Sequence, residues 1–130
     1  MTRPARETIL VADDDATIRR NLAMLLESEG YRVIANESGE EGLRILQTQH
    51  VDLVILDYWM SGMNGIAVAQ QIRTIRPAIP IIMLSGYAEL PGEAGGLADR
   101  WILKGRSTHD LLTAIAALLQ QGKGDSHPIS

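Results

Sequence analysis

Val51-Asp-Leu-Val-Ile-Leu-Asp57 is the stretch that decides the fold, together with Tyr58-Trp-Met-Ser-Gly-Met-Asn-Gly65 directly after it. Leu53 to Leu56 is an unbroken apolar run, which is typical of a strand buried on both faces at the centre of a parallel sheet. The strand ends in Asp57, and the glycines and asparagine that follow predict an immediate turn. In open α/β sheets, ligands bind at the carboxyl ends of such strands. Asp57 is therefore either a turn residue or a chemical group, and this stretch alone leaves both interpretations open.

The composition limits the class of protein. The chain has 130 residues, of which 45% are apolar and 22% charged, and this balance predicts one soluble globular domain. A net charge of -4 argues against binding nucleic acid directly. The absence of cysteine excludes disulfides, thiolate metal sites and a cysteine nucleophile. No apolar run approaches the roughly 20 residues of a membrane helix or resembles a signal peptide, so we expect a cytoplasmic protein without membrane contact.

Apolar periodicity along the chain predicts that strands and helices alternate. Further strands are predicted at Ile9–Ala12, Tyr31–Ala35, Pro80–Leu84 and Trp101–Leu103. The predicted helices are capped by Asp15, by Ser38 in a capping box with Glu41, by Asn64, and near Ser107 or Thr108. Pro91-Gly92 and Gly95-Gly96 oppose a regular helix after the fourth strand, so that helix is expected to be short or irregular.

Five strands that alternate with helices predict a single-domain, flavodoxin-like (βα)5 fold of the α/β class. This fold is a three-layer sandwich with a parallel sheet in the order 2-1-3-4-5. The domain is expected to occupy residues 1–121. The polar segment 122–130, which contains glycine and proline, is expected to be a disordered tail.

Four of the predicted strands end in residues suited to chemistry, namely Asp13 with Asp14, Asp57, Ser85 and Lys104. Because parallel strands point the same way, these ends converge on one edge of the sheet. Crowded carboxylates repel one another, and a hard divalent cation relieves the repulsion; an all-oxygen ligand set favours Mg²⁺. With Lys104 and the Ser85 hydroxyl, such a site forms a clamp for a phosphoryl group, with Asp57 as the nucleophile.

Each of these residues also has an ordinary structural interpretation. Asp13 and Asp14 are compatible with a polar loop that opens a helix. Ser85 is compatible with a cap at a strand end, and Lys104 with a solvated lysine. The coincidence of these chemistries at four strand ends favours one shared site over four separate structural roles.

Asp13-Asp14, Asp57 with Met60 and Gly65 after it, Ser85 and Lys104 together resemble the receiver domains of bacterial two-component response regulators. The resemblance covers about Thr8 to Leu119. It implies that Asp57 accepts a phosphoryl group from a phosphohistidine on a sensor histidine kinase or a phosphotransfer protein. It also implies that the domain catalyses its own phosphorylation and dephosphorylation.

The same resemblance implies roles for the residues around Asp57. Mg²⁺ would be held by Asp13, Asp14, Asp57 and the backbone carbonyl of Trp59, while Ser85 and Lys104 would bind the phosphoryl oxygens. Ser85 and Trp101 would form the switch, with Ser85 moving towards the phosphate and Trp101 swinging inward. The remodelled surface would then bind a downstream protein or a second copy of the chain.

The sequence departs from the family pattern at several positions. Ser61 and Gly105 stand where proline is usual, so the cis peptide bond expected after Lys104 is not predicted here. Trp101 is bulkier than the usual aromatic residue, which hinders the inward swing. Trp59 and Tyr87 are large rings two residues beyond Asp57 and Ser85, and we expect them to slow hydrolysis of the aspartyl phosphate by obstructing water.

Other functions remain open from the sequence. A degenerate receiver that acts only as a phosphorylation-independent interaction module is favoured by the irregular fourth helix and by Gly105, and opposed by the acidic residues. A hydrolase with an aspartyl-phosphate intermediate generally has a second acid two residues past its nucleophile, where this chain has Trp59. A flavodoxin is opposed because no Ser/Thr/Gly-rich phosphate loop follows the first strand.

Overall fold

The structure is a computed structural model that describes residues 6–60, 63–86, 97–105 and 108–126. The elements are β1 (Thr8–Ala12), α1 (Ala16–Ser28), β2 (Arg32–Asn36), α2 (Gly39–Thr48), β3 (Leu53–Asp57), β4 (Trp59–Met60), β5 (Met63–Asn64), α3 (Gly65–Ile75), β6 (Ile81–Ser85), β7 (Arg100–Leu103) and α4 (Thr108–Ser126). In the described part of the chain, no helix combines the length and apolar content that a membrane span requires.

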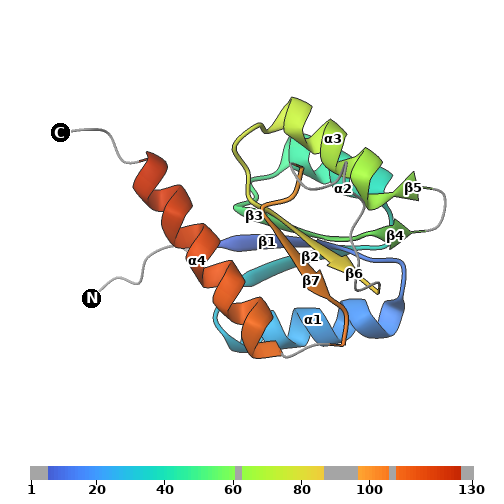
Figure 1. Cartoon of the computed structure of the whole chain (residues 1–130), viewed down its shortest axis with the longest axis horizontal. Coiled ribbons are helices and arrows are strands. Elements are labelled where there is room, and N and C mark those ends of the chain that lie inside the picture. Colours follow the sequence, from blue (N-terminus) through green and yellow to red (C-terminus); the bar gives the residue numbers. More distant parts are fainter. Residues whose placement is uncertain (1–5, 61–62, 87–96, 106–107, 127–130) are drawn as a thin grey trace.

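The main sheet has five strands in the order β2-β1-β3-β6-β7, and all its pairs are parallel. This is the predicted order, because β4 and β5 form a separate two-stranded antiparallel sheet. Figure 1 shows α2 and α3 on one face of the main sheet and α1 and α4 on the other. The predicted three-layer, flavodoxin-like α/β fold is confirmed. The expected short or irregular fourth helix falls on residues 87–96, which lie outside the described residues.

β3 is buried on both faces, as its sequence predicts. Val54 and Leu56 belong to the core that packs against α2 and α3, whereas Leu53 and Ile55 belong to the core that packs against α1 and α4. All four side chains are at most 1% exposed. Because the strand is held from both sides, its carboxyl end has a fixed position, and Asp57 is its last residue.

The helix starts also follow the sequence. Asp15 Oδ1 accepts hydrogen bonds from the N–H groups of Thr17 and Ile18, at 2.9 and 3.1 Å. Asn64 Oδ1 accepts from the Ala67 N–H at 3.0 Å. Ser38 Oγ accepts from the Glu41 N–H at 3.1 Å, which is one half of the predicted capping box.

The other half of the predicted capping box, a hydrogen bond from the Ser38 N–H to the Glu41 carboxylate, is not formed, so this part of the prediction is wrong. The Ser38 N–H donates to the side chain of Asn36 rather than to Glu41. The Glu41 carboxylate instead pairs with Arg44, one turn further along α2. An arginine three residues away is a stronger partner for a carboxylate than a neutral backbone N–H.

Two features of the fold differ from the sequence expectation. The short antiparallel pairing of β4 with β5 directly after the central strand was not predicted. In addition, α4 continues to Ser126, so helix extends into the segment expected to be a disordered tail. Residues 127–130 lie outside the described residues, and the domain boundary at residue 121 stays a prediction.

Candidate functional site

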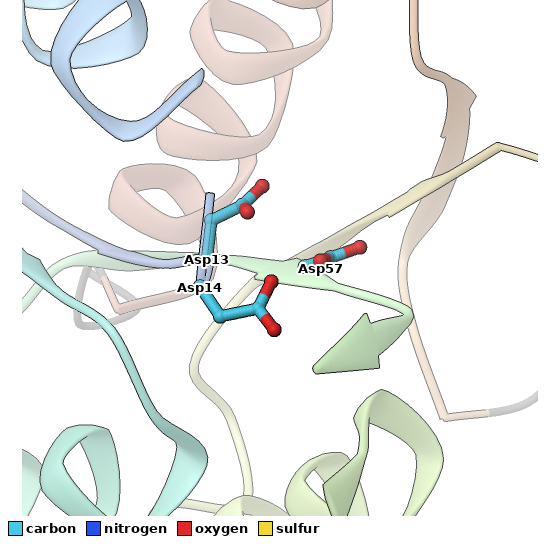
Figure 2. Close-up of side chains that lie close together, drawn as sticks. All are labelled: Asp13, Asp14 and Asp57. Atoms are coloured by element: carbon cyan, nitrogen blue, oxygen red, sulfur yellow. The ribbon is translucent and has the colours of Figure 1, made fainter. Parts of the chain in front are cut away.

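The three aspartates predicted to form the site meet at one edge of the sheet. Asp13 and Asp14 directly follow β1, and Asp57 ends β3, the strand beside it. Each of the three offers a carboxylate oxygen that lies within 4.8 Å of the other two. Figure 2 shows their side chains close together in the space beyond the strand ends. The structure therefore brings together the acidic residues that the sequence predicted to converge.

Lys104 joins this cluster from the carboxyl end of β7, the strand at one edge of the sheet. Its Nζ lies 2.9 Å from Asp57 Oδ1 and 3.4 Å from Asp13 Oδ2. Its own N–H donates to the Ser85 carbonyl at 2.7 Å, which fixes the start of the side chain to β6. Lys104 is therefore an ion-pair partner of the acidic cluster, and the interpretation as a merely solvated lysine is wrong.

The departure at Gly105 does not prevent this contact. The residue has φ +83, which the proline ring cannot adopt because it fixes φ near about -65°. No cis peptide bond occurs among the residues that the structure describes, in agreement with the sequence expectation. The loop after Lys104 thus follows a glycine-specific path that still directs the amine to Asp57.

Burial sets the electrostatics of the cluster. Asp13 and Asp57 are 1% and 4% exposed, whereas Asp14 is exposed to solvent. Burial raises the pKa of Asp13, the negative charge of Asp57 adds to the increase, and the Asp15 N–H and Lys104 only partly oppose it. Burial alone lowers the pKa of Lys104, but its hydrogen bond to Asp57 and the charge of Asp13 outweigh burial, so the net shift is upward. The environment therefore disfavours the ionised form of Asp13 and favours the charged form of Lys104.

One oxygen of Asp13 stands out. Its Oδ1 accepts a hydrogen bond from the Asp15 N–H at 2.9 Å. Its Oδ2 is buried and receives no hydrogen bond from the described residues, with the Lys104 amine at ion-pair distance only. A buried carboxylate oxygen without a donor is costly in a protein interior and suits a bound cation.

The remaining predicted residues lie around this cluster. The Trp59 N–H donates to Asp57 Oδ1 at 3.3 Å, while the Trp59 side chain is 67% exposed. Ser85 ends β6, the strand next to β3, and is 2% exposed. The metal bond to the Trp59 carbonyl and the phosphate contact of Ser85 stay predictions. Tyr87 lies outside the described residues.

Trp101 packs against the core on the α2 and α3 side of the sheet. Its ring centroid lies 5.7 Å from that of Tyr58, the residue after Asp57, and the two rings are tilted by 58°. Its Nε1 is buried without a hydrogen-bond partner among the residues described. The sequence did not reveal this contact, although an aromatic residue directly after Asp57 was a visible signal.

Gly65 explains how the turn after Asp57 is built. Its N–H donates to the Tyr58 carbonyl at 2.6 Å. A Cβ atom on Gly65 would lie 2.6 Å from the Met83 sulfur and 2.7 Å from the Asp57 carbonyl oxygen. Only glycine lets α3 start this close to the end of β3. Gly65 therefore positions the backbone of Asp57 rather than contributing chemistry.

Residues 9–116 match the family described as the response regulator receiver domain. The chain belongs to this family. The transcriptional regulatory protein ResD of Bacillus subtilis (strain 168) is 38% identical over 122 residues, which are 92% of this chain and 50% of ResD. The phosphate regulon transcriptional regulatory protein PhoB of Pseudomonas aeruginosa is 34% identical over 126 residues, 92% of this chain and 55% of PhoB.

Solved receiver structures have the same architecture. The response regulator TrrA of Thermotoga maritima, in complex with Mg²⁺-BeF, superposes with a TM-score of 0.82 at 34% identity, covering 86% of this chain and 98% of that one. A CheY-like receiver domain protein from Methanospirillum hungatei JF-1 gives a TM-score of 0.87 at 29% identity, covering 94% and 100%. This receiver domain spans about half the length of ResD and PhoB, and 19% of the length of GlrR of Escherichia coli (strain K12), which is 41% identical over 64% of this chain.

Proposed function

We propose that this receiver domain accepts a phosphoryl group on Asp57 from a phosphohistidine of a sensor histidine kinase or a phosphotransfer protein. The observation that carries the proposal is the approach of three carboxylate oxygens to within 4.8 Å, with the Lys104 amine 2.9 Å from Asp57. A degenerate receiver would have no need to keep a buried, mutually repelling acidic cluster, because such a cluster costs stability unless a cation or a lysine compensates it.

The residues present fit Mg²⁺. All the donors are oxygens, and Asp13 Oδ2 is a buried carboxylate oxygen without a hydrogen bond from the described residues. The related TrrA was solved in complex with Mg²⁺-BeF, which supports the same ion here. We assign Asp13, Asp14, Asp57 and the Trp59 carbonyl as its ligands. When bound, Mg²⁺ neutralises charge on the phosphoryl oxygens.

The chain's own residues then carry the transfer. A carboxylate oxygen of Asp57 forms a bond to phosphorus while the bond from phosphorus to the histidine nitrogen breaks, and its electron pair returns to the imidazole ring. The Lys104 ammonium, held charged by Asp57 and Asp13, attracts the transferred oxygens, and the Ser85 hydroxyl donates a hydrogen bond to them. Hydrolysis reverses the state, because a water oxygen bonds to phosphorus and the carboxylate leaves.

Transfer to Asp57 would also change what the domain binds. Ser85 and Trp101 form the proposed switch, and the surface around β7 and α4 would contact a downstream protein or a second copy of the chain. We propose a cytoplasmic location and a role in two-component or phosphorelay signalling, without direct contact to nucleic acid or membranes. A net charge of -4 supports the proposed lack of direct contact with nucleic acid and with membranes, whose surfaces are negatively charged.

Intact mass spectrometry tests the proposal. The protein is incubated with a small phosphodonor such as acetyl phosphate, with Mg²⁺ and with EDTA in its place. We expect the mass of one phosphoryl group to be added only with Mg²⁺, and not at all to Asp57→Asn. Equal labelling of wild type and Asp57→Asn would contradict the proposal, because the phosphoryl group would then lie on another residue. No labelling of wild type would also contradict it and would favour a phosphorylation-independent interaction module.

A further inference from the structure

The backbone of Asp13 is held from two sides. Its N–H donates to the Asn36 carbonyl at 3.1 Å, from the end of β2. Its carbonyl accepts a hydrogen bond from Arg19 Nη1 at 2.8 Å, from the first turns of α1. Asp13 Oδ1 is occupied by the Asp15 N–H at 2.9 Å. These three contacts fix the backbone and one oxygen of Asp13, and direct the other oxygen towards Lys104.

Arg19 is the part of this arrangement that the proposed phosphotransfer does not use. Its side chain is only 21% exposed, and its other polar contact is with Glu37 Oε2 at 4.0 Å. Glu37 is 77% exposed, and exposed pairs at that distance contribute little. The bond to the Asp13 carbonyl is charge-assisted and short, so it is the stronger of the two.

The start of α1 makes Arg19 a rigid support. Asp15 caps the helix, and the Arg19 N–H donates to the Asp15 carbonyl at 2.9 Å. The guanidinium therefore reaches back from a fixed helical turn to the loop that carries both Asp13 and Asp14. Arg19 also borders an open polar cleft with Asn36, Glu37 and Glu41, so its replacement leaves the apolar core intact.

Asp14 is the proposed ligand whose position depends most on this support. Its carboxylate is exposed, yet it lies within 4.8 Å of the buried oxygens of Asp13 and Asp57. A loop free to move would have to be ordered when the ion binds, and this ordering costs conformational entropy that weakens binding. Holding the peptide between Asp13 and Asp14 in advance removes part of that cost.

We propose that Arg19 is a positioning residue for the Mg²⁺ site, which acts by clamping the carbonyl of Asp13 and so presenting Asp14. The inference rests on the proposed function, because it concerns the ion that the acidic cluster would hold. Arg19 contacts neither the ion nor the phosphoryl group in this account. Its effect is therefore on the affinity for Mg²⁺ and not on the rate of transfer once the site is full.

The chain offers a matched control at the next position. Arg20 is exposed, and its side chain makes no hydrogen bond or ion pair with any described residue. Arg19→Met and Arg20→Met remove the same charge from the same helix and keep an unbranched apolar stem. Isothermal titration of each metal-free protein with Mg²⁺ measures the dissociation constant directly, and circular dichroism establishes that each variant is folded at the temperature used.

We expect Arg19→Met to raise the Mg²⁺ dissociation constant by about five- to tenfold, less than the full contribution of a charge-assisted hydrogen bond, because the clamp affects the ion only through the order of the loop. Arg20→Met should stay within about twofold of wild type, and phosphorylation at saturating Mg²⁺ should be similar in all three proteins. In metal-free protein, NMR should show faster amide exchange at Asp13 and Asp15 for Arg19→Met only. Equal Mg²⁺ affinities of Arg19→Met and Arg20→Met would overturn the inference alone, whereas a wild type that does not bind Mg²⁺ would overturn the proposed function as well.

Discussion

Replacing Gly65 by alanine should separate the packing of α3 against β3 from ordinary helix preference. The added Cβ would lie 2.6 Å from the Met83 sulfur, 2.7 Å from the Asp57 carbonyl oxygen and 3.0 Å from Tyr58 Cα. Two of these atoms are backbone, so the clash cannot be relieved by rotating a side chain. Overpacking of this kind costs about 1–3 kcal/mol, and the preference of helices for alanine recovers at most about 1 kcal/mol.

We therefore expect Gly65→Ala to lower the melting temperature by about 3–10 °C, from a net loss of about 1–2 kcal/mol. Because relief of the clash moves the end of β3, phosphorylation of Asp57 should also slow. Thermal unfolding followed by far-UV circular dichroism measures the first effect, and time-resolved intact mass measures the second.

Gly42 in α2 supplies the control. A Cβ there would have its closest contact at 3.6 Å, an ordinary van der Waals distance. Gly42→Ala should therefore stabilise the protein by about 0.5–1 kcal/mol and leave phosphorylation unchanged. If the two alanine variants gain stability equally, the close approach of α3 to Asp57 is not a constraint and the reasoning is refuted.

Three further predictions concern the site itself. Asp13→Asn should stabilise the metal-free protein at neutral pH, because burial raises the pKa of Asp13 above 3.8 and wild type therefore loses stability as the pH rises from 3.8 through that raised pKa. Melting curves over a pH series should show that the variant's advantage disappears towards pH 3.8. A variant that is less stable than wild type at neutral pH would contradict this. Trp59→Asn should shorten the lifetime of the aspartyl phosphate by about fivefold, if the exposed ring raises the activation free energy of attack by water by about 1 kcal/mol. Timed release of phosphate measures the lifetime, and an unchanged lifetime would refute the role of the ring. Tyr58→Leu should lower the free energy of unfolding by about 0.5–1.5 kcal/mol, because the ring contact with Trp101 is lost. Urea denaturation measures this in a Trp59→Phe background, in which the fluorescence comes from Trp101 alone. No change in stability or in emission would count against the contact.

The features that the sequence predicted well are those set by local chemistry. An apolar run of four residues buried on both faces identified β3, and the side chains of Asp15, Ser38 and Asn64 marked the helix starts. The convergence of Asp13, Asp14, Asp57 and Lys104 followed from parallel strand direction alone. These inferences required no knowledge of distances, because the direction and order of strands in a parallel sheet already determine which strand ends lie together.

The features that were missed depend on contacts between distant parts of the chain or on very short elements. The strands β4 and β5 have two residues each, too few for any periodic pattern. Gly122 and Gly124 indicated the end of a helix, yet α4 continues to Ser126. The bond from Arg19 to the Asp13 carbonyl crosses a helix cap and has no sequence signature. The contact of Tyr58 with Trp101 joins the residue after β3 to a residue within β7, and these two strands are not neighbours in the sheet.

The most direct test of the central claim is a crystal structure of the protein grown with abundant Mg²⁺ and beryllofluoride. We predict one ion bonded to oxygens of Asp13, Asp14 and Asp57 and to the Trp59 carbonyl, with beryllofluoride on Asp57 and in contact with Lys104 and Ser85. A structure in which the three aspartates have moved apart, with no ion between them, would contradict the account.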